Sequence, residues 1–379
     1  MHTADIAIIG AGPIGLELAV ALKDAGLDYV QFDAGQIGQT ITWYPKQVQF
    51  FSSPERIAIC GVPLVTQAQA KATREEYLAY LRGIVEQFDL PIQTYSRVTS
   101  IKRDDEGFTL TLQSSRGEEQ WRANRVVLTI GDMHRPRLLE VPGEDLPHVT
   151  HYFDDPHAYF RRKVLIVGGR NSAAEAAIRC HRAGAQVTLC CRREDFDRRS
   201  VKYWIAPELD WLIKTRRIAF YPSMRVARIM PAQTALCQMF DTQAADRSDE
   251  QIIEADHVLL LTGYEMDTSL LEQAGAAIDG LNRAPRLDHG TMQTTVPGLY
   301  VAGTAAAGTQ VRFRLFIENC HSHVIRLLRA LTGQPDAKPG HINGLAWERL
   351  REDPTGQGGE VAPAGPGQGS AETVAGLEQ

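Results

Sequence analysis

Six residues near the start of the chain, Gly10-Ala-Gly-Pro-Ile-Gly15, have the types and spacing that hold a phosphate group. Gly10 permits a tight turn, Gly12 lets the backbone approach a pyrophosphate, and Gly15 allows a helix to contact a strand closely. A helix that starts at this loop offers N–H groups and the positive end of its dipole to the phosphates. We therefore interpret the loop, with Pro13 and Ile14, as a dinucleotide-binding site.

The residues around this loop complete a βαβ unit. An apolar strand over 5–9 precedes it, a helical pattern ending at Gly26 follows, and "YVQFD" reads as a second strand that ends in Asp33. Asp33 comes eighteen residues after Gly15 (33 − 15), where a carboxylate can accept hydrogen bonds from an adenosine ribose. The alternative, a glycine-rich turn without a ligand, leaves this complete arrangement unexplained.

A second loop of the same kind follows the apolar stretch "KVLIV" and departs from the pattern at one position. Arg170 replaces the middle glycine, so the backbone cannot approach phosphates as closely, although its guanidinium could neutralise them. The loop consists of Gly168, Gly169, Arg170, Asn171, Ser172 and Ala173.

The charges that follow the two units differ. Arg192 and Arg193 stand after the second unit's next strand, where the first unit has Asp33, and a basic pair there suits a 2′-phosphate. A second basic pair, Arg198 and Arg199, is close enough to share this role, and a solvated charge pair is the alternative. We therefore expect FAD in the first unit and NADPH in the second, with the nicotinamide delivering hydride to the flavin.

These patterns predict an α/β fold with two Rossmann-like dinucleotide-binding domains, each in three layers (ββα). The first domain is discontinuous: residues 1–135 form its first part and residues 264–334 its second, with the NADPH-binding domain inserted at 136–263. Residues 335–379 are rich in Gly, Pro and Ala, and we expect this low-complexity tail to be disordered.

The composition bounds the class of protein. A chain of 379 residues with 44% hydrophobic and 23% charged residues is typical of a globular protein. The net charge of −6 argues against a nucleic-acid partner. No apolar run approaches the ~20 residues of a membrane helix, and the start lacks the features of a signal peptide. We expect a cytoplasmic protein with no membrane partner.

The cysteines and histidines show no metal-binding pattern. No cysteine forms C-x-x-C or pairs with histidine at zinc-ligand spacing, so we expect free thiols and no metal site. Three roles stay open for His323 on the predicted C-terminal helix: a group near the flavin, a group at a dimer surface, or a structural histidine. The cysteines are Cys60, Cys180, Cys190, Cys191, Cys237 and Cys320.

From about Ile6 to Leu331, the chain resembles the thioredoxin-reductase-like flavoproteins, and within them the bacillithiol disulfide reductase group. The matching segments include "GAGPIGL", "WYPKQVQFFSSPE", "VPGEDLPHVTHYF", "GGRNSAAEAA", "LLTGYEMD" and the "FIEN" helix. The resemblance implies FAD across the first and last segments, NADPH in the inserted one, a low-molecular-weight disulfide as substrate, and a homodimer or homotetramer.

The resemblance also implies further cofactor-binding residues. Tyr44 and Pro45, with the loop at Phe51 and Ser52, would lie by the isoalloxazine. Gly303 and Thr304 would pass near the ribityl phosphate, where related reductases carry Asp after Ala-Gly. The helix start at Phe316 and Ile317 would face the pyrimidine edge of the flavin. The remaining implied residues are Ala34, Gly38, Thr40, Gly131 and Gly263.

Two departures from the relatives bear on mechanism. The absence of C-x-x-C makes thioredoxin an unsuitable direct substrate, and Ile14 stands where many members of the group carry cysteine. Cys320 is the only cysteine in a motif near the flavin, and we expect it to lie two turns along its helix, too far to act. The catalytic group is then FAD itself.

We therefore expect an NADPH-dependent FAD oxidoreductase that reduces a small disulfide such as bacillithiol disulfide. One alternative is a ferredoxin–NADP reductase of thioredoxin-reductase type, which also lacks C-x-x-C. Another is a redox sensor that holds FAD and NADPH without turnover. A flavin monooxygenase is disfavoured because the F-x-G-x-x-x-H-S signature is missing between His148 and Lys163.

Overall fold

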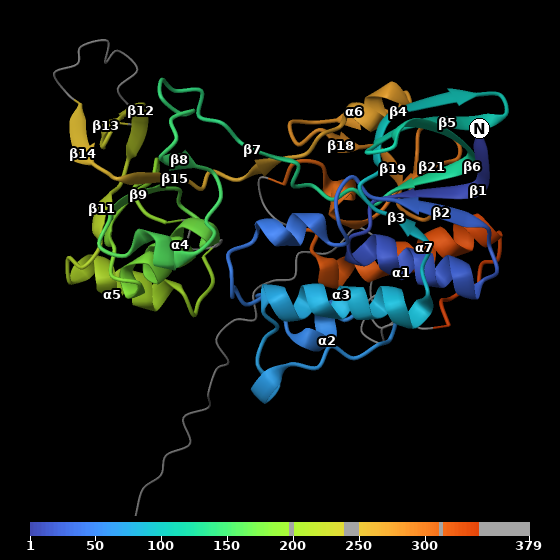
Figure 1. The fold of residues 1–379 in the computed structure, drawn as a ribbon, viewed down its shortest axis with the longest axis horizontal. Coiled ribbons are helices and arrows are strands. Elements are labelled where there is room, and N and C mark those ends of the chain that lie inside the picture. Colours follow the sequence, from blue (N-terminus) through green and yellow to red (C-terminus); the bar gives the residue numbers. More distant parts are fainter. Residues whose placement is uncertain (197–200, 239–249, 311–313, 341–379) are drawn as a thin grey trace, which may run out of the picture.

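The computed structural model describes residues 1–196, 201–238, 250–310 and 314–340. Figure 1 shows two α/β units side by side, with the chain crossing between them near β7. Arg198, Arg199 and residues 341–379 of the predicted tail lie outside the described residues.

The first unit is built on a nine-stranded sheet that combines both ends of the chain. Its parallel centre runs in the order β3-β2-β1-β6-β21, and β19, β20, β4 and β5 pair antiparallel at its margins. The strands are β1 (His2–Ile9), β2 (Tyr29–Phe32), β3 (Ile92–Gln93), β4 (Arg97–Asp104), β5 (Gly107–Ser114), β6 (Gly117–Leu128), β19 (Leu287–Asp288), β20 (Gln293–Thr294) and β21 (Leu299–Val301).

Helices cover one face of this sheet, as Figure 1 shows. They are α1 (Pro13–Asp24), α3 (Arg74–Phe88) and α7 (Ile317–Thr332), with the short α2 (Pro54–Ile57) beside them. The start of α3 is fixed by a capping box, in which Thr73 and Glu76 bond to each other's backbone N–H. The opposite face holds a second apolar cluster that includes residues of β4, β5 and α6 (Ser269–Gln273). The unit thus has three layers.

The second unit has a five-stranded parallel sheet in the order β11-β10-β9-β15-β8. Two helices, α4 (Asn171–Arg182) and α5 (Ala206–Lys214), pack on one face, and the antiparallel sheet β12-β13-β14 packs on the other. The strands are β8 (Val149–Thr150), β9 (Lys163–Val167), β10 (Gln186–Cys190), β11 (Ala219–Tyr221), β12 (Met224–Met230), β13 (Gln233–Gln238), β14 (Gln251–Glu254) and β15 (His257–Leu260).

The chain crosses between the units through two short strands that pair with each other. β7 (Arg135–Pro136) and β16 (Tyr264–Glu265) form an antiparallel ribbon, and the predicted domain borders at 135/136 and 263/264 fall within and directly before these strands. Three aromatic rings gather at the junction: Trp43 lies 5.6 Å from Tyr152 and 6.4 Å from Tyr264 between ring centroids. A further two-stranded sheet joins β17 (Ile278–Asp279) and β18 (Ala284–Pro285).

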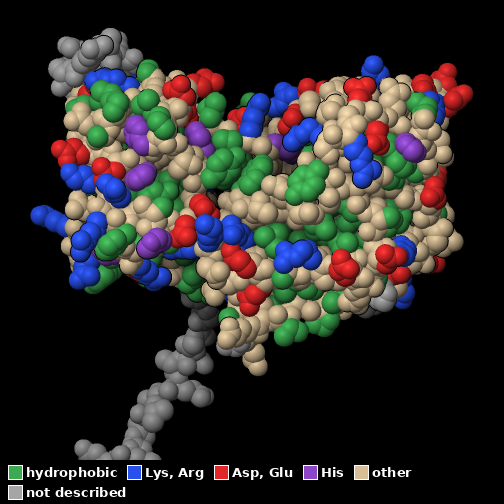
Figure 2. All heavy atoms as spheres, viewed as in Figure 1, with side chains coloured by type: hydrophobic (Ala, Val, Ile, Leu, Met, Phe, Trp, Pro, Cys, Tyr) green, Lys and Arg blue, Asp and Glu red, His purple; other side chains and the backbone are tan. Residues whose placement is uncertain are grey.

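The surface in Figure 2 mixes basic and acidic side chains over both units, without a face of a single sign in that view. No helix in the described part of the chain is both long and apolar enough to cross a membrane.

A buried polar pair ties α1 to α7 inside the apolar layer. Glu17 and His321 are 4% and 1% exposed, and the carboxylate of Glu17 lies 2.7 Å from Nδ1 of His321. Nε2 of His321 donates to the carbonyl of Arg56 at 3.1 Å, because a carbonyl oxygen can only accept. Both ring nitrogens are therefore engaged, and α1, α2 and α7 are held in one register.

We expect Glu17→Ala to destabilise the first unit strongly, because it removes the buried carboxylate that lies against Nδ1 of His321. Breaking such a pair costs about 3 kcal/mol or more. Glu86→Ala is the matched control, since Glu86 is exposed on α3. Thermal and urea unfolding measure the difference, and equal midpoints for the two variants would contradict the role assigned to the pair.

Candidate cofactor site

The first glycine loop lies where β1 ends, between β1 and its parallel neighbour β6. Ligands of open α/β sheets bind at this edge, outside the carboxyl ends of the strands. Thr129, directly after β6, donates its hydroxyl to the carbonyls of Ile9 (3.1 Å) and Gly10 (2.9 Å). The loop is thus folded against the end of β6.

The three glycines of the loop do different things. A Cβ on Gly10 would lie 2.5 Å from the carbonyl oxygen of Thr129, and one on Gly15 would lie 2.3 Å from that of Gly10. A Cβ on Gly12 would meet nothing within 4 Å. Gly10 and Gly15 are therefore required by the fold, whereas Gly12 leaves the backbone open on its outer side.

The start of α1 fits a pyrophosphate. Its N-cap is Gly12, no side chain caps it, and Pro13 takes the first helical position. The N–H groups of the first turn therefore face an open side of the loop, the arrangement that binds anions at helix N-termini. That this loop holds a dinucleotide stays a prediction.

The structure brings Asp33 and Gly38 to this loop. One oxygen of Asp33 accepts the N–H of Ala11 at 2.6 Å, and the other accepts that of Gly35 at 2.8 Å. Burial raises the pKa of Asp33, and these two hydrogen bonds oppose that shift. Gly38 donates its N–H to the carbonyl of Ala11 at 3.0 Å. Asp33 thus supports the loop directly and keeps acceptor lone pairs for a ribose.

The remaining residues predicted after β2 lie close by in sequence. Ala34 is exposed, and Thr40 lies half-buried in the 3₁₀ helix Gln39–Trp43 that begins after Gly38.

The segment after β21 joins the loop from the C-terminal part of the chain. A Cβ on Gly303 would lie 3.6 Å from Cβ of Ile14, so the two backbones pass close together. Gly303 donates its N–H to Nδ1 of His323 on α7 at 3.2 Å. Of the three roles left open for His323, the structure supports the structural one: it positions Gly303 beside the loop.

Asp132 is a site residue that the sequence reasoning missed. It is 8% exposed and accepts hydrogen bonds from the hydroxyl of Thr304 and, at 3.0 Å, from the side-chain amide of Gln310. Burial raises its pKa, against the effect of both donors. Gly131 before it adjoins the same group, since a Cβ there would lie 3.9 Å from Oγ1 of Thr304. In the sequence its carboxylate follows the apolar stretch "VVLTIG", and this position was the available signal.

Thr304 therefore has a carboxylate beside it, supplied by the segment that follows β6. Burial and the charge of Asp132 raise the pKa of Tyr44 to about 12, which places Tyr44 in electrostatic range of Asp132. Pro45 follows, half-buried, in the turn closed by the N–H of Val48.

Other predicted flavin residues are not brought to the first loop. Phe51 packs against the apolar cluster of the second unit, with Ser52 half-buried beside it. Phe316 is the N-cap of α7 and is 40% exposed, and Ile317 begins the helix. Asn319 accepts the N–H of Phe316 at 2.8 Å.

The second loop has the same build at the end of β9. A Cβ on Gly168 would lie 2.6 Å from the carbonyl oxygen of Leu261, whereas one on Gly169 would make only ordinary contact, at 3.5 Å, with Cβ of Cys191. Arg170 is the N-cap of α4, its backbone is extended, and no side chain caps the helix. The predicted residues Asn171, Ser172 and Ala173 form its first turn.

The basic pair stands where the sequence predicts it. Arg192 and Arg193 are exposed and follow β10, the strand beside β9, as Asp33 follows β2 beside β1. Gly263, exposed after β15, accepts the N–H of Arg137 at the crossing between the units.

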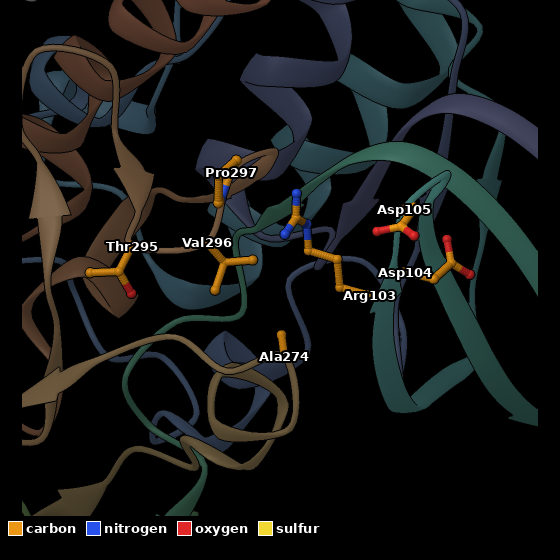
Figure 3. A pocket seen from close by; sticks show the side chains of 7 residues that line it. All are labelled: Arg103, Asp104, Asp105, Ala274, Thr295, Val296 and Pro297. Atoms are coloured by element: carbon orange, nitrogen blue, oxygen red, sulfur yellow. The ribbon is translucent and has the colours of Figure 1, made fainter.

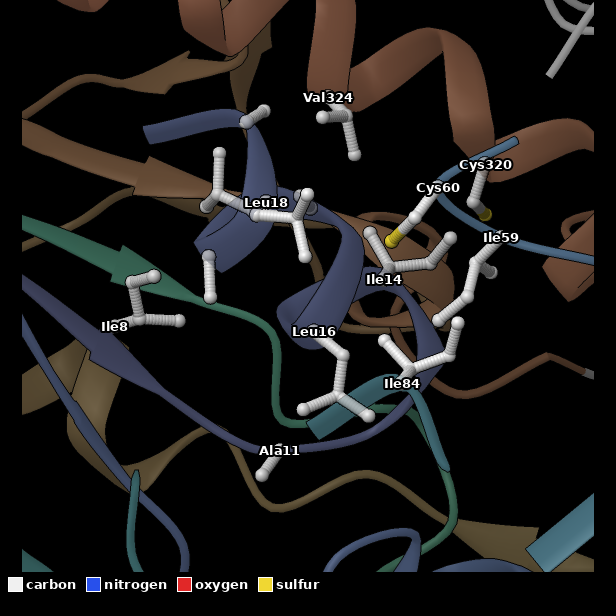
Figure 4. Packing of buried hydrophobic residues seen from close by; sticks show 14 of the residues in the cluster. Ile8, Ala11, Ile14, Leu16, Leu18, Ile59, Cys60, Ile84, Cys320 and Val324 are labelled. Atoms are coloured by element: carbon white, nitrogen blue, oxygen red, sulfur yellow. The ribbon is translucent and has the colours of Figure 1, made fainter. Parts of the chain in front are cut away.

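All six cysteines are free and buried. Cys60 and Cys320 belong to the apolar cluster that contains Ile14, and Figure 4 shows the side chain of Cys60 directed toward Ile14. Burial raises the pKa of both thiols, which keeps them protonated and poorly nucleophilic. The expectation that Cys320 lies two turns along its helix was wrong: it is the fourth residue of α7 and is fully buried.

A surface pocket elsewhere on the first unit has no part in these arrangements. Figure 3 shows its lining, which comes from the end of β4 and the turn after it, the residue after α6 and the segment before β21. It contains no predicted site residue. The lining residues are Arg103, Asp104, Asp105, Ala274, Thr295, Val296 and Pro297.

Comparison with known families agrees with the two-loop arrangement. Residues 7–303 match the family described as pyridine nucleotide-disulphide oxidoreductase. The chain belongs to this family. As a pyridine nucleotide-disulphide oxidoreductase it is an enzyme that works with a flavin and a nicotinamide cofactor.

Individual relatives show which members of this family the chain is similar to. The chain is 32% identical to bacilliredoxin reductase Bdr of Bacillus subtilis over 83% of this chain and 94% of that protein. It matches the bacillithiol disulfide reductase Bdr of Bacillus cereus with a TM-score of 0.81 at 30% identity, over 88% of this chain and 100% of that one. A ferredoxin–NADP reductase of Ignicoccus hospitalis is 26% identical over 79% of this chain and 89% of its own length. The fold is that of the thioredoxin-reductase-like flavoproteins.

Because Gly12 and Gly15 have different roles, we expect their alanine variants to differ in stability and in flavin retention. Gly15→Ala should lower the thermal midpoint of the flavin-free protein by several degrees, because its Cβ would overlap Gly10 and Thr129. Gly12→Ala should leave that midpoint nearly unchanged and reduce flavin retention, because its Cβ would occupy the open side of the loop. Calorimetry and the flavin-to-protein ratio test this, and equal loss of stability in both variants would refute it.

His323 predicts a dependence of stability on pH. Burial and the charge of Arg326 lower the pKa of His323 to about 3, whereas the unfolded value is 6.5. As the pH falls below 6.5, the unfolded chain therefore binds a proton that the folded protein does not. Titration of His323 then lowers the free energy of unfolding by about 1.4 kcal/mol per pH unit. Urea unfolding from pH 7.5 to 5 measures the slope. His323→Gln keeps an acceptor for Gly303 without titrating, so its slope should be shallower; an unchanged slope would contradict the assignment.

Proposed function

We propose that the protein is an NADPH-dependent FAD oxidoreductase. The observation that carries this proposal is the pair of helix starts without side-chain caps, α1 and α4, each at the end of a parallel strand. Asp33 beside the first suits a ribose, and the basic pair beside the second suits a 2′-phosphate. The relatives' family uses flavin and nicotinamide in general, and these charges support the finer choice of FAD and NADPH.

We propose a low-molecular-weight disulfide as the substrate, with bacillithiol disulfide the first candidate. The similarity to bacilliredoxin and bacillithiol disulfide reductases supports this choice. In the balanced reaction, one NADPH and one proton supply the two electrons and two protons that convert a disulfide into two thiols. We also propose a homodimer or homotetramer, on the resemblance, and a cytoplasmic protein without a nucleic-acid partner, on the composition and net charge of the sequence.

The proposal assigns binding and electrostatic roles to the chain and leaves the redox chemistry to bound FAD, which supplies hydride acceptance and two-electron transfer. Gly12 and the first turn of α1 would hold its pyrophosphate, and Asp33 its ribose. Thr304, supported by Asp132, would hold its ribityl part. The start of α7 supplies a positive dipole end for negative charge on the ring system.

A ferredoxin–NADP reductase is the second candidate, and the thiols favour it. Ile14 is an alkyl side chain at 6% exposure, and all six cysteines are buried, so the described residues offer no exposed thiol for a mixed disulfide. One-electron transfer to an external protein needs no such thiol. The similarity to the Ignicoccus reductase agrees with this candidate.

Anaerobic stopped-flow spectroscopy separates the candidates. The purified holoenzyme is reduced with one equivalent of NADPH and mixed with bacillithiol disulfide or with ferredoxin. Rapid flavin reoxidation with release of two thiols per NADPH supports the disulfide reductase. Reoxidation by ferredoxin but not by the disulfide would reject the disulfide reductase and support the ferredoxin–NADP reductase. No reoxidation by either would support the redox sensor without turnover.

Arg192→Glu tests the choice of nicotinamide cofactor. Replacing the guanidinium by a carboxylate should raise the KM for NADPH about tenfold or more, because a charge-assisted hydrogen bond to the 2′-phosphate becomes a repulsion. The KM for NADH should change little. Arg225→Glu makes the same charge change at an exposed position on β12 and serves as the control. Equal effects of Arg192→Glu on NADPH and NADH would exclude the 2′-phosphate contact.

A further inference from the structure

Two lysines and two aromatic rings cross the junction between the units. Lys71 of the first unit places Nζ 3.8 Å from the ring centroid of Trp204 in the second, and Lys202 of the second places Nζ 5.6 Å from the ring of Phe51 in the first. The rings of Phe51 and Trp204 stand edge-on, 6.0 Å apart. We name these four residues the crossed lysine cluster. Each ammonium of the cluster rests on an aromatic ring of the opposite unit.

The cluster is anchored at both ends. Nζ of Lys71 donates to the backbone carbonyl of Phe51 at 2.7 Å, which fixes the direction of the lysine. The backbone N–H of Lys202 donates to the side-chain oxygen of Asn171, in the first turn of α4, at 2.9 Å. Tyr203, 82% exposed, stands edge-on to Trp204 at 4.8 Å. The cluster is therefore hydrogen-bonded to the first turn of α4, which follows the second glycine loop.

The charges of the cluster are not balanced within the described residues. Lys71 and Lys202 are half-buried, and burial together with the charge of Lys202 lowers the pKa of Lys71. Neither ammonium forms an ion pair with a carboxylate in the part of the chain that the structure describes. Lys46, at the same junction, contrasts with them, since Asp154 lies 3.2 Å and Asp155 3.7 Å from its Nζ.

We propose that the crossed lysine cluster binds an acidic group of the substrate, so that the enzyme selects carboxylate-bearing low-molecular-weight disulfides. This inference rests on the proposed disulfide reductase activity. An anion between two ammonium groups removes their mutual repulsion and forms two charge-assisted hydrogen bonds. The rings of Phe51 and Trp204 flank the two ammonium groups, and Trp204 is 41% exposed.

The position of the cluster favours the substrate over the nicotinamide cofactor. Half of it, Lys71 and Phe51, belongs to the first unit, whereas the loop and the arginine pair assigned to NADPH belong wholly to the second. A ligand held by Lys71 and Lys202 would contact both units, whereas a ligand confined to the second loop and the arginine pair would contact only the second unit.

Steady-state kinetics with disulfides of different charge test the proposal. The probes are 3,3′-dithiodipropionate (two carboxylates), 2-hydroxyethyl disulfide (neutral) and cystamine (two ammonium groups). Lys71→Gln and Lys202→Gln should each lower kcat/KM for the dicarboxylate about tenfold and leave the neutral probe within twofold. Lys102→Gln, at an exposed position on β4, is the matched control.

Variants that reverse or keep the charge of the lysines change the preference among the probes, which would stay the same if the cluster had only a structural role. The double variant Lys71→Glu/Lys202→Glu should prefer cystamine to the dicarboxylate. Lys71→Arg should retain the preference of the natural enzyme. Equal losses for all three probes in the Gln variants would overturn the proposal, because the cluster would then serve the fold or the junction.

Binding measurements separate this proposal from its premise. Titration of the oxidised holoenzyme with NADP⁺ should give the same Kd for the natural protein and both Gln variants. A rise in that Kd with unchanged disulfide kinetics would assign the cluster to the cofactor phosphates and overturn the proposal. If the natural enzyme reduces no disulfide, the proposed function fails. Calorimetric titration with 3,3′-dithiodipropionate then decides the cluster alone: binding lost in the Gln variants supports it, and no binding to the natural protein refutes it.

Discussion

The close contact between the first glycine loop and Thr129, just after β6, governs the geometry of the site. Gly10 and Gly15 both lie against Thr129, and neither has room for a Cβ. The close packing of these glycines on Thr129 fixes where α1 begins, and it therefore determines which backbone N–H groups of the helix face outward. It also sets the end of β6, from which Asp132 reaches Thr304, and the position of Ile14 beside Gly303. One steric constraint thus aligns segments more than 170 residues apart (303 − 132 = 171).

Local signals in the sequence predicted the βαβ units well, because glycine spacing and apolar periodicity act within about thirty residues. The strand before the first loop was placed at 5–9, and β1 begins at His2. Helix α3 was missed although Thr73 and Glu76 carry a capping-box signature. The three-stranded sheet β12-β13-β14 was missed because its cross-strand pairing has no local period of its own.

The contacts that join distant segments had no signal in the sequence. Asp132 meets Gln310 only after the first unit has folded, and Lys71 meets Trp204 only after the two units have docked. Periodicity says which face of an element is buried, and it does not say which distant side chain lies opposite. The burial of Cys320 illustrates the same limit: its helix was expected, but its depth depends on the packing of α7 against α1.

The insertion of the second unit into the sequence of the first has a consequence for biosynthesis. β21 and α7 complete the first sheet and its helical layer, yet they follow the whole second unit in the chain. A ribosome therefore releases β1 to β6 long before their last partners exist, and the apolar side of α1 that α7 covers waits uncovered. The second unit, whose strands are contiguous in sequence from β8 to β15, has all its partners first. The nascent chain is thus expected to mature from the middle outward, with its first-made segment closing last.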